Sequence, residues 1–199
     1  IISTKKELPD LSGWSCTCGI DYSKISDFAS VNLHFRNGDQ RYDISHSWLC
    51  LKSKDIPRMK CPWRDWAEQG LLTLVDDVEI HPAYLADYIA EKKKEFNIEK
   101  LALDDFRYAL LSDALRKIGF DAKTYKNVKL VRPSDIMRVA TMIDSCFANQ
   151  WFTWGDNPVL RWATNNTKLI RANRKAGKED DADVGNFVYG KIEAKSRKT

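Results

Sequence analysis

Residues 14–21 read WSCTCGID and predict the first strand of the fold, which ends on Asp21. Tryptophan, threonine and isoleucine are common in strands, and the polar stretch that follows predicts a turn. Residues 28–35 and 42–51 carry partly alternating apolar side chains, and the sequence NGD at 37–39 between them is typical of a hairpin turn. The N-terminal part of the chain is therefore predicted to form three antiparallel strands.

Downstream of these strands, helical and strand-like patterns alternate. Residues 98–103 form a short apolar run that leads into Asp104, and residues 106–118 carry apolar side chains at helical spacing until Gly119. The other predicted helices are 63–69, 82–96, 134–147 and 158–166, and the other extended segments are 71–75, 120–125, 151–154, 169–170 and 186–192. This order predicts an α/β fold in which a mixed sheet combines antiparallel N-terminal hairpins with parallel strands and carries helices on its faces.

The composition is that of a folded chain. The 199 residues are 43% hydrophobic and 30% charged, which is typical of one globular domain or at most two small ones. No window approaches the ~18 uncharged apolar residues of a membrane span, and the first residues lack the apolar run of a signal peptide. The five cysteines are scattered and odd in number, so reduced thiols and a cytosolic setting are expected.

The excess positive charge is concentrated near the C-terminus. The chain has 32 Lys and Arg against 28 Asp and Glu, a net charge of +4. Residues 168–199 hold nine of the basic and five of the acidic residues, which accounts for all of that excess. Such a segment suits contact with a phosphate backbone, and a solvated charged surface is the alternative interpretation.

Several common catalytic motifs are absent. The chain contains neither G-x-x-x-x-G-K-[ST] nor G-x-G-x-x-G, so nucleotide binding through a glycine loop is not indicated. It also contains neither G-x-S-x-G nor H-E-x-x-H, the patterns of serine hydrolases and zinc proteases.

Two aspartates stand where predicted strands end. Asp21 closes the first strand, and Asp104 closes the apolar run 98–103. If these strands are parallel neighbours, their ends meet, and carboxylates gathered there repel unless a hard cation such as Mg²⁺ or Mn²⁺ is coordinated between them. A turn or helix-capping role is the alternative for each aspartate.

An ordered set of segments carries a family resemblance. In chain order these are GIDYS at 19–23 with Asp27 shortly after, LALD at 101–104, WGDNPVLRW at 154–162 with two following asparagines, and the basic segment 185–199. The set resembles the C-terminal nuclease domain of the terminase large subunit of tailed bacteriophages. The resemblance implies an RNase H-like fold and a Mg²⁺- or Mn²⁺-dependent two-metal endonuclease that cuts concatemeric viral DNA during genome packaging.

The resemblance also assigns roles to individual residues. Asp21 and Asp104 would be catalytic and would bind metal, and Asp27 would be an auxiliary metal-binding acid. Asp105 and Asp183 rank lower, since Asp105 neighbours the matching position and Asp183 precedes the last strand. The family's third acid usually follows a Lys-x-Arg-Lys-Thr-like segment and is therefore expected just beyond Thr199.

The remaining expectations concern partners. The candidate DNA-binding residues are Arg171, Arg174, Lys175, Lys191, Lys195, Arg197 and Lys198. By resemblance, residues 1–12 would be a linker remnant from an ATPase domain of the same polypeptide, and residues 13–199 the nuclease domain. Double-stranded DNA, the portal and the small terminase subunit would be the partners, in the host cytoplasm and away from any membrane.

Two alternatives of other kinds remain. In the first alternative, the chain is a non-catalytic module of the same fold that binds DNA or the portal. In the second, it is another RNase H-like nuclease, of the resolvase or transposase type.

Overall fold

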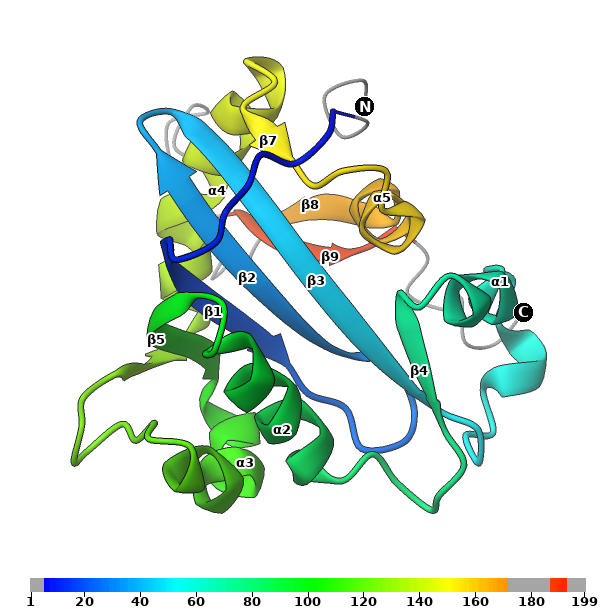
Figure 1. Cartoon of the computed structure of the whole chain (residues 1–199). Coiled ribbons are helices and arrows are strands. Elements are labelled where there is room, and N and C mark those ends of the chain that lie inside the picture. The colour runs from blue at the N-terminus through cyan, green and yellow to red at the C-terminus, as the bar shows by residue number, and fades with distance from the viewer. Residues whose placement is uncertain (1–5, 172–186, 193–199) are drawn as a thin grey trace, which may run out of the picture.

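The computed structural model describes residues 6–171 and 187–192, and their arrangement is built around one mixed sheet (Figure 1). The strand order is β4-β3-β2-β1-β5-β6, and the short strand β7 pairs with β3. The strands of this sheet are β1 (Ser15–Asp21), β2 (Ala29–Asn37), β3 (Gln40–Cys50), β4 (Leu72–Val75), β5 (Asn97–Asp104), β6 (Val128–Val131) and β7 (Phe152–Thr153).

The three N-terminal strands pair antiparallel, as the sequence predicts. β1 pairs with β2 and β2 with β3, and the turn between β2 and β3 places Gly38 at φ 58°. Glycine adopts this left-handed conformation without steric cost, which explains the NGD sequence at the turn. β5 pairs parallel with β1, β6 with β5 and β4 with β3, so the predicted mixed sheet is also confirmed.

Helices cover the sheet from both sides (Figure 1). The helices are α1 (Trp63–Glu68), α2 (Pro82–Lys92), α3 (Asp105–Lys117), α4 (Pro133–Ala148) and α5 (Pro158–Asn165), with a short 3-10 helix at Ile56–Arg58. α2 and α3 pack on one face of the sheet, whereas α4, α5 and the two-stranded hairpin of β8 (Thr167–Arg171) and β9 (Phe187–Lys191) lie on the other.

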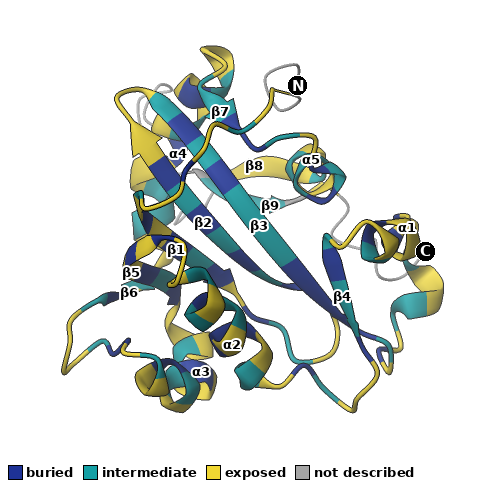
Figure 2. Ribbon diagram, viewed as in Figure 1, coloured by how far each residue is buried: buried dark blue, intermediate teal, exposed yellow. Residues whose placement is uncertain are grey.

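The main core lies between the sheet and helices α2 and α3. Along β2, Ala29, Val31, Leu33 and Phe35 are fully buried, and the residues between them are not (Figure 2). This period of two is expected for a strand with one face on the core. The residues that these side chains pack with include Cys18, Ile20, Leu85, Ile89, Leu101, Leu103, Leu111 and Leu115.

A smaller apolar cluster anchors α1 and α5. Trp66 and Trp162 lie 5.7 Å apart between ring centroids, and Trp162 lies 5.9 Å from Phe28, the residue just before β2. Leu49 of β3 and Val159 of α5 belong to the same cluster. α5 is thereby held beside the start of β2, on the face opposite the main core.

The predicted strand at 120–125 is wrong. This segment is a turn, because Asp121 Oδ1 accepts hydrogen bonds from the backbone N–H groups of Lys123 at 2.8 Å and Thr124 at 2.6 Å. An aspartate that bonds to the following backbone in this way favours a turn over a strand. The predicted helix 82–96 is also too long, because α2 ends at Lys92. Phe96 instead packs against Phe35 in the core, with 5.0 Å between the ring centroids.

The cysteines are free and buried, which agrees with the expected reduced thiols. Burial raises the pKa of the Cys16 thiol to about 12 and that of Cys18 further still, so both remain protonated near neutral pH. Within residues 6–171 and 187–192, no helix has the length and apolar character needed to cross a membrane.

Adjacent leucines of α3 test the core assignment. Leu111 is fully buried, whereas Leu110 is 42% exposed. Leu111→Ala should destabilise the fold by about 2–5 kcal/mol and lower Tm by roughly 5–15 °C, because it leaves a cavity. Leu110→Ala makes the same chemical change on the surface, so calorimetry should show a much smaller shift. Equal losses in the two variants would contradict the assignment.

The turn at Asp121 makes a prediction about pH. Hydrogen bonds from the N–H groups of Thr124 and Lys123 lower the pKa of Asp121 from 3.8 to about 2. Because the folded-state pKa is the lower one, the charged carboxylate stabilises the fold above about pH 4, and this contribution is lost as the pH falls toward 2. In urea unfolding at about pH 6, the wild type should have a larger free energy of unfolding than Asp121→Asn. This difference should become smaller by about pH 3. A difference that stays constant would contradict the lowered pKa.

Candidate functional site

The ends of β1 and β5 bring two predicted site residues together. The two strands are parallel neighbours, and the last residues paired between them are Ile20 and Leu103. Asp21 and Asp104 each come one residue later, so they stand at the same edge of the sheet, at the carboxyl ends of adjacent strands (Figure 1). This meeting of residues 83 positions apart in the chain is the geometry that a parallel pair imposes.

The two aspartates also share a face of the sheet. Ile20 and Leu103 are buried in the core, and the residue that follows each of them points to the opposite face and is exposed. Strand register continues this line across the sheet: Asp21 pairs with Ser30 of β2, and Ser30 pairs with Ser47 of β3. We call Asp104, Asp21, Ser30 and Ser47 the acid row.

Asp104 has a local structural role as well. It is the N-cap of α3, and its Oδ1 accepts a hydrogen bond of 2.8 Å from the backbone N–H of Phe106. The helix-capping alternative is therefore correct for Asp104. It does not exclude metal binding, because an ionised carboxylate offers about four acceptor positions and the cap uses one of them.

The other predicted acids that the structure describes, Asp27 and Asp105, do not end a strand. Asp105 is the exposed first residue of α3 rather than a strand residue. Asp27 is half-buried in the connection between β1 and β2, and its Oδ1 accepts a hydrogen bond of 3.0 Å from the N–H of Phe28. Burial, with a smaller contribution from the charge of Asp27, raises the pKa of Cys61 to about 11. Asp183 lies outside the described residues.

The donor set at the strand ends suits a hard divalent cation. Asp21 and Asp104 are exposed and supply carboxylate oxygens, and Mg²⁺ is commonly held by one or two carboxylates together with water and substrate phosphates. Across residues 6–171 and 187–192, no group of three or more His, Cys, Asp or Glu is arranged to hold a metal ion. The described part of the site is thus a pair of carboxylates.

A hydrogen-bonded polar layer continues from the acid row along β2 and β3. Asn32 donates from Nδ2 to Asp43 Oδ1 at 2.7 Å, and His34 Nδ1 lies 2.9 Å from the same oxygen. The carboxylate of Asp43 is buried, and α5 closes over the layer where Asn157 Nδ2 donates to Ser45 Oγ at 3.4 Å. These polar residues alternate with the apolar ones in 28–35 and 42–51, and which of them meet across the strands is set by the register of β2 and β3.

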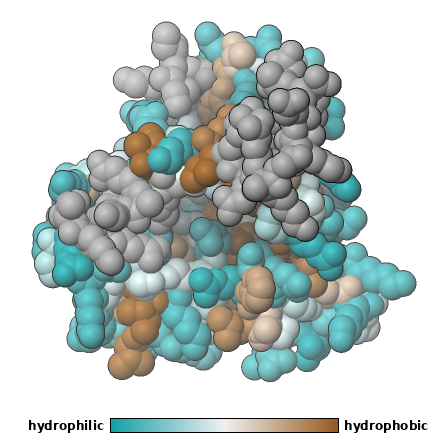
Figure 3. Space-filling model, turned by 180° about the vertical axis from the view of Figure 1, so that it is seen from behind, coloured by the Kyte–Doolittle hydropathy of each residue, from teal (hydrophilic) through white to brown (hydrophobic). Residues whose placement is uncertain are grey.

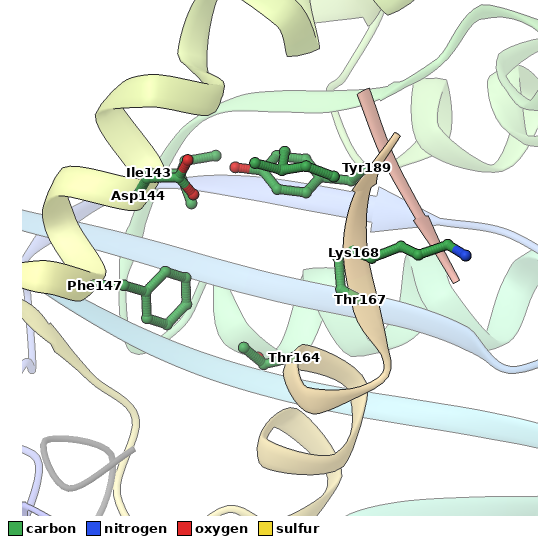
Figure 4. Close-up of a pocket in the computed structure, with 8 residues that line it drawn as sticks. Ile143, Asp144, Phe147, Thr164, Thr167, Lys168 and Tyr189 are labelled. Atoms are coloured by element: carbon green, nitrogen blue, oxygen red, sulfur yellow. The ribbon is translucent and has the colours of Figure 1, made fainter. Parts of the chain in front are cut away.

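A cavity of about 360 Å³ opens between α4, α5 and the β8–β9 hairpin (Figure 4). Asp144 of α4 and Tyr189 of β9 line it from opposite sides, and Tyr189 donates a 3.2 Å hydrogen bond to the carbonyl oxygen of Ala140. Burial, with a smaller contribution from the charge of Asp144, raises the pKa of Tyr189. Among the residues that the structure describes, the lining of this cavity includes none of Asp21, Asp27, Asp104 and Asp105.

The structure covers the candidate DNA-binding residues only in part. Arg171 ends β8 and Lys191 ends β9, which places them at opposite ends of this antiparallel hairpin. The structure does not describe the side chains of these two residues. The other candidates also lie outside the described residues: Arg174, Lys175, Lys195, Arg197 and Lys198. From behind, the described surface is mostly hydrophilic, with separate apolar patches (Figure 3).

Comparison with known proteins identifies relatives. Residues 4–180 match the family model described as the terminase large subunit, endonuclease domain. The structure resembles the large terminase of bacteriophage HK97, with a TM-score of 0.74 and 17% identity over 94% of this chain and 37% of that one. It also resembles the large terminase nuclease of thermophilic phage G20c, with a TM-score of 0.55 and 7% identity over 96% of this chain and 83% of that one. No curated protein matches.

These comparisons agree with the fold. The structural similarity extends over at least 94% of this chain in both comparisons, and the fold is RNase H-like, as the sequence resemblance implies. The chain spans little more than a third of the length of the HK97 protein, at 37%. Since the family model covers most of the sequence, the chain belongs to the family of terminase large-subunit endonuclease domains.

Proposed function

We propose that this chain is a divalent-metal-dependent DNA endonuclease that cuts concatemeric viral DNA during genome packaging. The observation that carries the proposal is the placement of Asp21 and Asp104 at the ends of adjacent parallel strands, on one exposed face. Membership in the endonuclease-domain family supports the same conclusion.

In this proposal Asp21 and Asp104 hold Mg²⁺ or Mn²⁺ at the sheet edge. Neighbouring carboxylates repel each other, and they gain most from a cation bound between them. The bound cation would supply Lewis-acid stabilisation of the reacting phosphodiester. The chain contributes rigidity: Asp21 belongs to a strand paired on both sides, and Asp104 is fixed by its cap to α3.

A two-metal arrangement needs further ligands. We propose that the third acid lies just beyond Thr199, following the family pattern that the C-terminal segment resembles. Asp27 is an auxiliary candidate, and Asp105 and Asp183 are weaker ones. Asp105 starts a helix next to Asp104, where its side chain takes a different direction from that of the strand-end acid.

The partners follow from the same assignment. Double-stranded DNA is the proposed substrate, contacted through the basic C-terminal segment. Residues 13–199 would be the nuclease domain, and residues 1–12 would connect it to an ATPase domain of the same polypeptide. The portal and the small terminase subunit would be partners of the whole protein, acting in the host cytoplasm.

Substitution of the two strand-end acids tests the proposed site. In the protein made from the complete reading frame, Asp21→Asn and Asp104→Asn should each reduce Mn²⁺-dependent cleavage of supercoiled plasmid by more than about 100-fold, since each removes a charged ligand. Asparagine caps helices about as well as aspartate, so Asp104→Asn changes the charge while keeping α3 in place. Gel analysis of nicked and linear plasmid measures the rate.

The control is Asp113→Asn, an exposed aspartate of α3 that forms an ion pair with Arg116. It should cut at the wild-type rate. Cleavage that survives in Asp21→Asn or Asp104→Asn would contradict the site. A wild-type protein that binds DNA but does not cut it with either metal would instead favour the non-catalytic module.

If the basic C-terminal segment contacts DNA phosphates, its charge should set how DNA affinity depends on salt concentration. Each phosphate contact lowers the slope of log K against log salt concentration by about 0.9. Arg174→Gln combined with Lys175→Gln should therefore weaken DNA binding and reduce the magnitude of the slope by about 2, measured by fluorescence anisotropy at several salt concentrations. Lys94→Gln combined with Lys117→Gln removes the same charge from exposed positions near the C-terminal ends of α2 and α3 and should leave the slope unchanged. Equal slopes for wild type and the Arg174 and Lys175 variant would contradict the assignment.

A further inference from the structure

Ser30 is the cross-strand neighbour of Asp21. The two residues are directly opposite in the antiparallel register of β1 and β2, and directly opposite residues point to the same face. Side chains in such a pair have Cβ atoms about 4.5–5.5 Å apart, close enough to interact. Asp104 lies beside Asp21 on β5, so Ser30 and Asp104 flank Asp21 from its two neighbouring strands.

The hydroxyl of Ser30 is hydrogen-bonded to that of Ser47. Ser47 lies opposite Ser30 on β3, and their Oγ atoms are 2.8 Å apart. Ser47 is 4% exposed, so its hydroxyl depends on a protein partner for hydrogen bonding. A serine hydroxyl has one hydrogen to donate and can accept two hydrogen bonds. When Ser47 donates to Ser30, the hydrogen of Ser30 is directed to another acceptor.

The carboxylate of Asp21 is the acceptor that the register provides. An ionised carboxylate only accepts, so with Ser47 as donor a further hydrogen bond from Ser30 to Asp21 would give every hydroxyl hydrogen an acceptor. On the same face, the preceding residue of β1 is Gly19, which has no side chain. A Cβ added there would have only the carbonyl oxygen of Asn32 nearby, at 3.9 Å. No side chain of β1 therefore crowds this side of Asp21.

We propose that Ser30, held by Ser47, is a positioning residue that orients the Asp21 carboxylate for binding of the divalent cation. This inference rests on the proposed function and extends the site from two acids to the whole acid row. Partners that hydrogen-bond to metal-binding side chains fix their orientation, and their loss typically weakens metal affinity by about 10- to 100-fold. Ser30 acts through Asp21 and does not itself bind the metal.

Metal binding without DNA tests the inference directly. In the complete protein, Mn²⁺ affinity is measured from the electron paramagnetic resonance signal of the free ion. Ser30→Ala should bind Mn²⁺ about tenfold more weakly, and Ser30→Thr, which keeps a hydroxyl, should stay near wild type. Ser47→Ala leaves Ser30 in place but removes its partner, so it should weaken Mn²⁺ binding as well. It also serves as the test if Ser30→Ala fails to fold.

The matched control is Ser45→Ala. Ser45 lies on the same strand and face as Ser47, two residues away, and bonds to Asn157 instead. It should leave Mn²⁺ affinity unchanged. Wild-type affinity in Ser30→Ala, or an equal loss in Ser45→Ala, would overturn the role of Ser30 while Asp21→Asn still weakens binding. If Asp21→Asn itself keeps wild-type Mn²⁺ affinity, the proposed metal site fails as a whole.

Discussion

The parallel pairing of β1 with β5 is the constraint on which the site depends. Parallel strands end at the same edge of a sheet, so one backbone ladder places Asp21 beside Asp104 although 82 residues separate them in the chain. The connection between these strands contains β2, β3, α1, β4 and α2, and only β6 and β7 of the sheet lie outside it. The edge that carries the acids is therefore supported by most of the molecule.

The two faces of the sheet differ in the side chains that they carry. One face carries the fully buried side chains of β2 and packs against α2 and α3, and this apolar burial stabilises the strands. The other face carries the acid row and the hydrogen bonds of the buried Asp43 with the partly buried Asn32 and His34. A buried polar group that loses its hydrogen-bond partner costs about 1–3 kcal/mol, so a layer of this kind favours the side-chain orientations that make these bonds. The acids thus stand on a rigid surface rather than on a loop.

Much of the fold could be predicted from local patterns. The alternation in 28–35 and 42–51, the glycine turn at 37–39 and the stripe of 106–118 each follow from side-chain period and turn chemistry. The segment 120–125 could not, because a single side chain, Asp121, reorganised its backbone through hydrogen bonds. The same limit applies to the acid row: the sequence shows Ser30 and Ser47 as ordinary strand residues, and their relation to Asp21 appears only in the register.

The sequence by itself determined which residues could form strands and helices, where the two acids end their strands, and the family that the ordered segments resemble. These properties are local or depend on order along the chain. Tertiary structure decided which strands became neighbours, which face the acids share and which hydroxyls stand beside them. Strand pairing joins residues far apart in sequence, and its register is set by how all the apolar faces pack at once, a condition that no single segment contains.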